Sequence, residues 1–436
     1  MSAFNKIEEK KQTSDLDKVK ELLDDPKTTL PDVLTNQICY KALKLKYPPL
    51  IEYFSQNSPQ LLTYALSMNN KIGQFAYTIL MENERSITSS LVSRDAITEG
   101  AKKVFNGPPS HLFVARLAEI SFIICTLSPD SSIPVCKFMP RFVLFGEEPD
   151  VLDLFAKLLS ENPIAQHIQS KLIQAGFVDS LVTSITNANN PDHFGGTALY
   201  VIGLFKIIAM CGKSPIIAPV VHNPDVAIPL LRDFPISPYQ VKNARWSAVL
   251  SICTKENAAA FYPILDQACR ELSFGPELYE YQLDAIHILL RFSSISANVS
   301  KRMVELNFAS LLGTILQKFP NHTFGHAMVA KVFRDTTKNP ILGPHVFTLL
   351  PFIADAIVNR KQIVLAATSL SLLMDLMKYA NTHPEMVKIL GQHINQTHAC
   401  WNYARSAASL FASGYGGPLP DPSAPPVGNG PSAIAH

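Results

Sequence analysis

Charged residues are scarce in this 436-residue chain: Asp, Glu, Lys and Arg make up only 17% of it, against roughly 25% in an ordinary globular protein. The two signs nearly cancel, with 38 Lys+Arg against 36 Asp+Glu and a formal net charge of +2. Binding to nucleic acid usually rests on a basic excess, so we expect no nucleic-acid partner. Hydrophobic residues reach 47%, which excludes a chain that is disordered throughout.

The chain also lacks the cysteine patterns of secreted and zinc-binding modules. Its cysteines number 7, which is odd, and no C-x-x-C pair occurs, a usage typical of a reduced intracellular protein. Residues 1–20 are rich in Lys, Glu and Asp and contain no apolar core of a secretory signal. The most apolar stretch, 198–211, is shorter than the ~20 residues that a bilayer requires and is interrupted by Lys206. We therefore expect no membrane span and a cytoplasmic protein, with the nucleus as a second location.

Catalytic fingerprints are missing as well. No G-x-S-x-G elbow and no G-x-G-x-x-G loop occurs, so neither a hydrolase nucleophile nor a dinucleotide fold has support. Gly212-Lys213-Ser214 is similar to the end of a phosphate-binding loop, but Ile207 replaces the required glycine and Pro215 obstructs the following helix. We predict a helix end there, no catalytic residue and no cofactor.

One histidine pair has metal-like spacing. His322 and His326 are four residues apart, which would place both imidazoles one turn apart on a helix. Zincin chemistry also needs a glutamate directly after the first histidine, and here that residue is Thr323. No third ligand stands at a fixed offset. We predict a structural role, with one histidine capping or filling a helix contact, and keep a zinc hydrolase built on His322 and His326 as the enzyme-class alternative.

Strand alternation is absent, whereas helical periodicity is abundant. Roughly twenty short apolar segments, many with proline at the first helical position, follow one another up to residue 412. They include 14–23, 151–159, 166–173, 178–185, 198–210, 278–292, 309–319, 346–358 and 363–379. Paired helices of this kind are too apolar to stand alone, and they predict an all-α armadillo or HEAT-like solenoid whose repeats of ~40 residues have degenerated in sequence.

Composition divides the chain into four regions. We predict a flexible N-terminus over 1–13, followed by the solenoid over 14–412. Six prolines between residues 214 and 240 deny that stretch a continuous helix and indicate an ordered insert or surface crossover. The Gly/Pro-rich segment 413–436 has no packable face and is predicted to be a disordered tail.

Tryptophan is nearly absent, which bears on the class of solenoid. Armadillo-type nuclear-import receptors bind their cargo with ladders of Trp followed four residues later by Asn. The two tryptophans here, Trp246 and Trp401, are followed at that offset by Leu250 and Arg405. A function as an import receptor therefore has no support in the sequence.

Two stretches resemble the SAPS-domain family, the armadillo-like regulatory subunits of the type-six serine/threonine protein phosphatase. The first comprises TTLPDVL (28–34), KYPPLIEYFS (46–55) and AYTIL (76–80), similar to the opening helices of that family. The second is LLGTILQKFPNHTFGH (311–326), similar to its leucine-rich helix and the turn that follows. The aromatic, proline, phenylalanine and histidine of this motif are retained as Phe319, Pro320, Phe324 and His326.

The sequence also departs from the family pattern. Asn321, His322 and Thr323 replace a tryptophan and two asparagines, and Gln282 replaces an arginine before Leu283. The resemblance spans most of residues 14–360 in the order and separation of its blocks.

The resemblance implies a non-catalytic subunit that binds a serine/threonine phosphatase catalytic subunit, with further scaffold subunits able to join. Lys331 and Arg334, just after the second block, are the basic positions that we single out as partner contacts, since interfaces depend on a few anchors that include arginine. The binding-class alternative is an armadillo-like adaptor for trafficking or the cytoskeleton.

Overall fold

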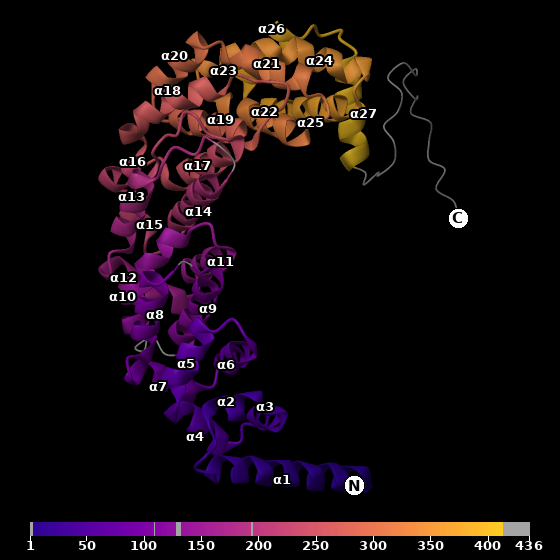
Figure 1. Cartoon of the computed structure of the whole chain (residues 1–436). Helices are drawn as coiled ribbons and strands as arrows, with labels where there is room; N and C mark the ends of the chain where they lie inside the picture. The colour runs from indigo at the N-terminus through magenta and orange to yellow at the C-terminus, as the bar shows by residue number, and fades with distance from the viewer. Residues whose placement is uncertain (1–2, 109, 128–131, 193–194, 413–436) are drawn as a thin grey trace. The chain divides into compact units, whose positions relative to one another are not determined.

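The computed structural model describes residues 3–108, 110–127, 132–192 and 195–412, with residues 3–13 and 411–412 described by backbone alone. None of these residues forms a β-strand, and all regular elements are α-helices or short 3-10 helices, labelled η (Figure 1). The all-α, solenoid-like fold predicted from the sequence is thereby confirmed. The predicted tail, 413–436, lies outside the described residues.

By its internal contacts the chain divides into two compact units, Met1–Cys253 and Thr254–His436. The helices of the first unit are α1 (Ala3–Asp24), α2 (Leu30–Thr35), α3 (Gln37–Lys44), α4 (Pro48–Gln56), α5 (Ser58–Ser67), α6 (Lys71–Met81), α7 (Arg85–Ser93), α8 (Ala96–Asn106), α9 (His111–Leu127), α10 (Ser132–Phe138), η1 (Met139–Phe145), α11 (Pro149–Leu158), α12 (Pro163–Gln174), α13 (Phe177–Asn187), α14 (Gly196–Cys211), α15 (Ala218–Val221), α16 (Pro224–Leu230) and α17 (Tyr239–Ile252). Those of the second are η2 (Ala258–Phe261), α18 (Tyr262–Glu271), α19 (Glu280–Ser293), α20 (Ala297–Glu305), α21 (Phe308–Lys318), α22 (Thr323–Thr336), α23 (Leu342–Val346), η3 (Phe347–Leu349), α24 (Leu350–Asn359), α25 (Ile363–Ala380), α26 (Pro384–His393) and α27 (Cys400–Ala412).

Helix α1 is longer than the sequence pattern predicts. The predicted helix begins at Ser14 and the residues before it are expected to be flexible, whereas the backbone is helical from Ala3. Residues 6–12 are rich in Lys, Glu and Gln, which favour helix by propensity without an apolar face, so the periodicity does not reveal them. Val19, in the later turns, is buried, and α1 contacts α3 and α4.

Proline and asparagine set the starts of many helices. Asn162 caps α12: its side-chain Oδ1 accepts a hydrogen bond from Ile164 N at 2.9 Å, and Pro163 takes the first helical position. Proline fits there because the first backbone N–H groups of a helix have no partner within it. Asn223 and Pro224 repeat the arrangement at α16, inside the proline-rich stretch 214–240, which therefore folds into short helices.

In the first unit, α9, α11, α14 and α17 contact one another in sequence, and α13 contacts α16 alongside them. The packing of α14 is unusually close. A Cβ built at Gly203 would lie 1.8 Å from the carbonyl oxygen of Gly146, so the backbone of α14 touches the turn between η1 and α11. Only glycine permits this approach.

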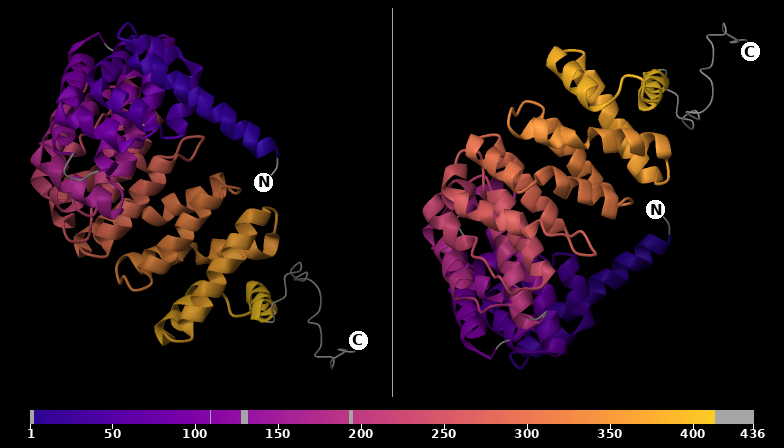
Figure 2. Two further views of the ribbon diagram at one scale, coloured as in Figure 1. Left: turned by 90° about the horizontal axis from the view of Figure 1, so that it is seen from below. Right: turned by 90° about the horizontal axis from the view of Figure 1, so that it is seen from above.

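The second unit repeats a group of three helices, one short and two longer, as α20–α21–α22 and again as α23–α24–α25. The last helix of each group contacts the last helix of the next, so that α19, α22 and α25 form one row, seen below α21 and α24 in Figure 1 and side by side in Figure 2. The core of these groups includes the fully buried rings of Phe308, Phe333 and Phe347, and the centroids of the last two lie 6.2 Å apart. This three-helix grouping is typical of armadillo repeats.

Buried polar side chains recur where the end of one helix packs against the next helix. Each bonds to main-chain carbonyl groups where an adjacent helix finishes, and the residues are Arg116 on α9, Gln169 on α12, Arg245 on α17, Gln282 on α19 and His326 on α22. The last four carbonyls of a helix have no partner within it, so a buried end needs a donor of this kind. Gln282 on α19 donates to the carbonyls of Glu271 and Ser273, both at 3.2 Å, at the end of α18. Arg245 on α17 does the same for a carbonyl just after α16.

Two stretches of the second unit, Leu342–Asn359 and Ile363–Ala380, are long and apolar enough to cross a membrane by length and composition, with mean hydropathies of 1.3 and 1.4. In each, 44% of the residues are buried inside the protein, and core helices of soluble proteins meet the same criterion. The absence of a membrane span therefore stays a prediction from the sequence.

Candidate functional site

The family-like block, residues 311–326, forms most of α21, the turn after it and the first residues of α22. Leu312, Ile315 and Leu316 of α21 are buried, and Phe319 and Pro320 in the turn are half-buried. The ring of Phe324 points outward, with 76% of the residue exposed. Of the retained motif, Phe324 is thus the side chain that meets solvent, and its neighbours build the corner between the two helices.

The two histidines of this block bond to the backbone. His322 is the N-cap of α22, and its Nδ1 accepts a hydrogen bond from Gly325 N at 3.0 Å. His326 is fully buried, and its Nε2 lies 3.0 Å from the carbonyl oxygen of Phe319. Since a carbonyl can only accept, Nε2 carries the proton and donates it. Burial lowers the pKa of His326, and the Phe319 bond opposes this shift.

These bonds leave little for a metal at the histidine pair. The lone pair of His322 Nδ1 accepts from the backbone, and the proton of His326 Nε2 is donated to it. His326 Nδ1 is buried and has no hydrogen-bond partner among the described residues. Across the described ranges, no group of three or more His, Cys, Asp and Glu side chains could hold a metal ion. The geometry gives no support to the zinc-hydrolase alternative.

Lys331 and Arg334, the basic positions singled out in the sequence, lie on the solvent side of α22. Lys331 pairs with Asp335 one turn later, at 2.8 Å between Nζ and Oδ2. Arg334 pairs across to α25, with 3.0 Å between its Nη1 and Oδ2 of Asp375. All four side chains are about half exposed, so each pair adds at most about 1 kcal/mol to stability.

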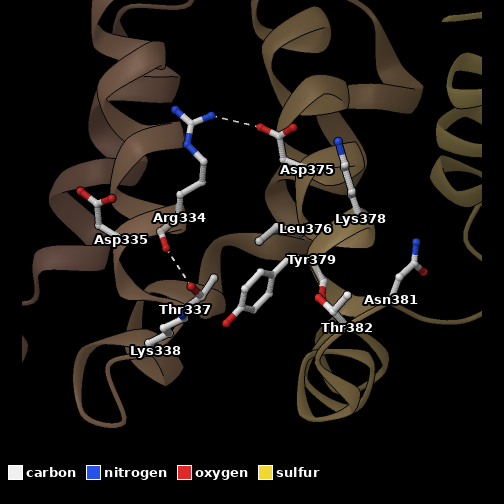
Figure 3. Close-up of a pocket in the computed structure, with 10 residues that line it drawn as sticks. All are labelled: Arg334, Asp335, Thr337, Lys338, Asp375, Leu376, Lys378, Tyr379, Asn381 and Thr382. Carbon is white, nitrogen blue, oxygen red and sulfur yellow. Dashed lines mark hydrogen bonds and ion pairs between the residues drawn. The ribbon is translucent and has the colours of Figure 1, made fainter. Parts of the chain in front are cut away.

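The Arg334–Asp375 pair borders a surface groove between the C-terminal ends of α22 and α25 (Figure 3). The groove has a volume of about 850 Å³, within the size range of sites that hold ligands or peptide segments. Tyr379 projects into it from α25 between the two helices (Figure 3). Its charged lining residues are Arg334, Asp335 and Lys338 from the α22 side and Asp375 and Lys378 from α25.

A second hollow of about 300 Å³ lies on the other side of α22, against the turn between α19 and α20. It shares Asp335 and Lys338 with the first, so the two hollows adjoin at these residues. We call the pair the turn groove. At its α19 end Ile295 is 48% exposed and offers an apolar contact.

Hydrogen bonds fix the turns that line the groove. Asn339, after α22, donates to Ser293 O at 3.2 Å and to Ser300 Oγ at 2.9 Å, which ties this turn to the end of α19 and to α20. Its Oδ1 accepts from Ile341 N and Leu342 N, at 3.1 and 2.9 Å. Because its side-chain amide bonds both to the end of α19 and to its own turn, Asn339 fixes the position of one hollow relative to the other.

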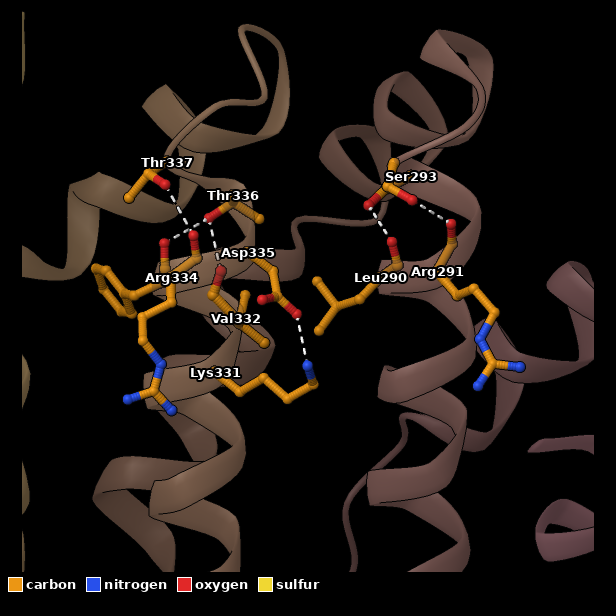
Figure 4. A network of polar contacts seen from close by, with 11 residues as sticks. Leu290, Arg291, Ser293, Lys331, Val332, Arg334, Asp335, Thr336 and Thr337 are labelled. Carbon is orange, nitrogen blue, oxygen red and sulfur yellow. Dashed lines mark hydrogen bonds and ion pairs between the residues drawn. The ribbon is translucent and has the colours of Figure 1, made fainter. Parts of the chain in front are cut away.

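Positive charge predominates around the groove. The pKa of His287 on α19 is lowered, first by burial and then by the nearby cations Lys331 and Arg291, while Asp335 opposes the shift. Both groove acids, Asp335 and Asp375, are engaged by Lys331 and Arg334 (Figures 3 and 4). Among the described residues, neither Lys338 nor Lys378 has an acidic side chain within ion-pair distance.

Sequence reasoning found part of this site. Lys331 and Arg334 follow the family-like block, and Asp335 and Lys338 continue the same helical spacing, a signal that extends the prediction to them. Lys378 and Tyr379 were missed. They come from α25, and nothing in the sequence pairs the end of that helix with the end of α22.

Comparison with known proteins gives little more. No family model matches the sequence, and no curated protein does either. Solved structures that match include an engineered protein from the Northeast Structural Genomics Consortium, with 13% sequence identity over 84% of this chain and 97% of that one and a TM-score of 0.41. A likeness at that level carries no argument about function.

Proposed function

We propose that this protein is a non-catalytic regulatory or scaffolding subunit that binds a serine/threonine protein phosphatase catalytic subunit and directs it to substrates. The resemblance of residues 28–80 and 311–326 to the SAPS-domain family supports the choice of partner. The armadillo-like stacking supports the mode of action, since stacked helical repeats mostly present extended surfaces to other proteins. Metals and phosphoryl chemistry would then belong to the partner.

The observation that carries the proposal is the position of the family-like block directly before the helix that reaches the turn groove. It forms the α21–α22 corner, and α22 then runs to the turn groove, where Arg334 and Lys338 meet solvent. Buried side chains and His326 fix the corner, and the exposed charges follow within about four turns, on α22 and in the turn after it. A cytoplasmic complex, with the nucleus as a second location, fits this function.

Affinity capture tests the proposal. The tagged full-length protein, recovered from extract of its own organism, should bring with it a type-six-like phosphatase catalytic subunit in near-stoichiometric amounts. Purified alone, the protein should show no phosphatase or protease activity. Repeated recovery of coat, motor or tubulin components without any phosphatase would overturn the proposal and favour the adaptor alternative.

A further inference from the structure

The geometry points to a binding activity of the chain by itself: the turn groove holds an extended peptide segment that carries carboxylate side chains. The groove lies wholly within the second unit, along the C-terminal ends of α19, α22 and α25. It offers cations without acidic partners, hydroxyl groups and a limited apolar surface. This is the chemistry of an acidic peptide site.

Charge complementarity identifies the occupant. Four cations surround the groove, Lys331, Arg334, Lys338 and Lys378, against the two acids Asp335 and Asp375. Each acid already has a cation at 2.8 or 3.0 Å. A basic or neutral peptide would leave Lys338 and Lys378 uncompensated, whereas a carboxylate near each would complete the balance of charge.

An alternative role for Lys338 and Lys378 is to offset the partial negative charge at the C-terminal ends of α22 and α25. Carbonyls at both helix ends already accept hydrogen bonds from nearby groups. At the end of α25, Tyr379 O accepts from the backbone of Thr382, from its hydroxyl at 3.1 Å and from His383 at 3.1 Å.

The end of α22 is similarly satisfied. The hydroxyl of Thr337 donates to Arg334 O at 2.8 Å (Figure 4), that of Thr336 donates to Phe333 O at 3.3 Å, and Asn339 N donates to Thr336 O at 2.9 Å. The ammonium groups of Lys338 and Lys378 are therefore not required by the helix ends and remain available to a ligand.

The dimensions fit a short peptide. Neighbouring packed helices lie 8–10 Å apart, so the path across three of them is about 20 Å. An extended chain covers that distance with about six residues. Successive side chains of such a segment point to opposite sides, so acidic residues at alternate positions would face the lysines while intervening apolar residues contact Ile295 and Tyr379.

Fluorescence anisotropy with the purified full-length protein tests the site. The probe is a labelled peptide of about this length with alternating Glu and Leu, and its Gln-for-Glu counterpart is the matched peptide control. Reversing both lysines, Lys338→Glu with Lys378→Glu, should weaken binding of the acidic peptide about tenfold or more at low salt. The milder pair Lys338→Gln with Lys378→Gln should give an intermediate loss.

Lys318→Glu with Lys361→Glu is the control variant of equal charge change. Lys318 is the last residue of α21, near the start of α22, and Lys361 lies two residues before α25, so both are at the helix ends opposite to the groove. Binding should stay within about twofold of the unaltered protein, because charges about 20 Å away are screened. Equal losses in the control variant, or equal binding of the Glu and Gln peptides, would overturn the inference. Since no extract is involved, these outcomes are independent of phosphatase capture.

Discussion

At the scale of single residues, His326 illustrates how a motif residue serves the fold. Its ring is fully buried and donates to Phe319 O at the end of α21. His326→Ala would remove that donor, leave the carbonyl without its partner and open a cavity, so we expect a loss of about 2–4 kcal/mol in the free energy of unfolding. His322→Ala removes only the N-cap hydrogen bond of α22 and should lower the free energy of unfolding by about 1 kcal/mol. Urea unfolding of both variants compares the two, and equal costs would contradict the assignment.

Asp284 on α19 predicts a pH dependence of stability. Burial, with Glu280 adding to it, raises its pKa from 3.8 to about 7. The folded protein therefore binds a proton that the unfolded chain releases between about pH 4 and pH 7, and stability falls as the pH rises through that window. Asp284→Asn removes the cost of ionisation, so its gain in melting temperature should be larger near pH 8 than near pH 5. A gain that does not change with pH would mean that the carboxyl group is solvated.

At the scale of elements, the contact between α14 and the turn before α11 depends on Gly203. Gly203→Ala would place a Cβ 1.8 Å from Gly146 O, and backbone cannot move aside as a flexible side chain can. We expect a loss of about 3 kcal/mol or more in the free energy of unfolding. Gly196→Ala, at the start of the same helix with nothing within 4 Å of its Cβ, is the matched control and should change stability by less than about 0.5 kcal/mol.

Periodicity predicted the helices far better than their partners. The predicted segment 198–210 matches α14 (Gly196–Cys211), and 278–292 matches α19 (Glu280–Ser293), because both have proline or glycine near their ends and continuous apolar content. The contact at Gly203 could not be predicted, since it depends on which turn comes to lie against α14. For the same reason the sequence singles out Lys331 and Arg334 but not Lys378, which is far from both along the chain.

At the scale of the whole molecule, the proposed scaffold function requires a binding surface that persists in a protein stable without its partner. The turn groove meets this condition through exposed ion pairs that contribute little to stability and through turns fixed by Asn339. Its surface charges can therefore change with small effect on the fold. Mutations there should affect binding before they affect folding.

Charge reversal on α22 tests whether the proposed partner binds at this helix. Lys331→Glu with Arg334→Glu should reduce capture of the phosphatase catalytic subunit about tenfold if these cations anchor the partner. The reversal also brings acids together beside Asp335 and Asp375, so repulsion within the groove is a competing cause of any loss.

The exchange Arg334→Asp with Asp375→Arg separates the two causes, because it restores an ion pair between α22 and α25 while moving the cation to the other helix. We expect the exchanged protein to keep its melting temperature within about two degrees, as expected for an exposed pair, and still to lose phosphatase in quantitative mass spectrometry. Undiminished capture by both variants would place the phosphatase contact away from α22.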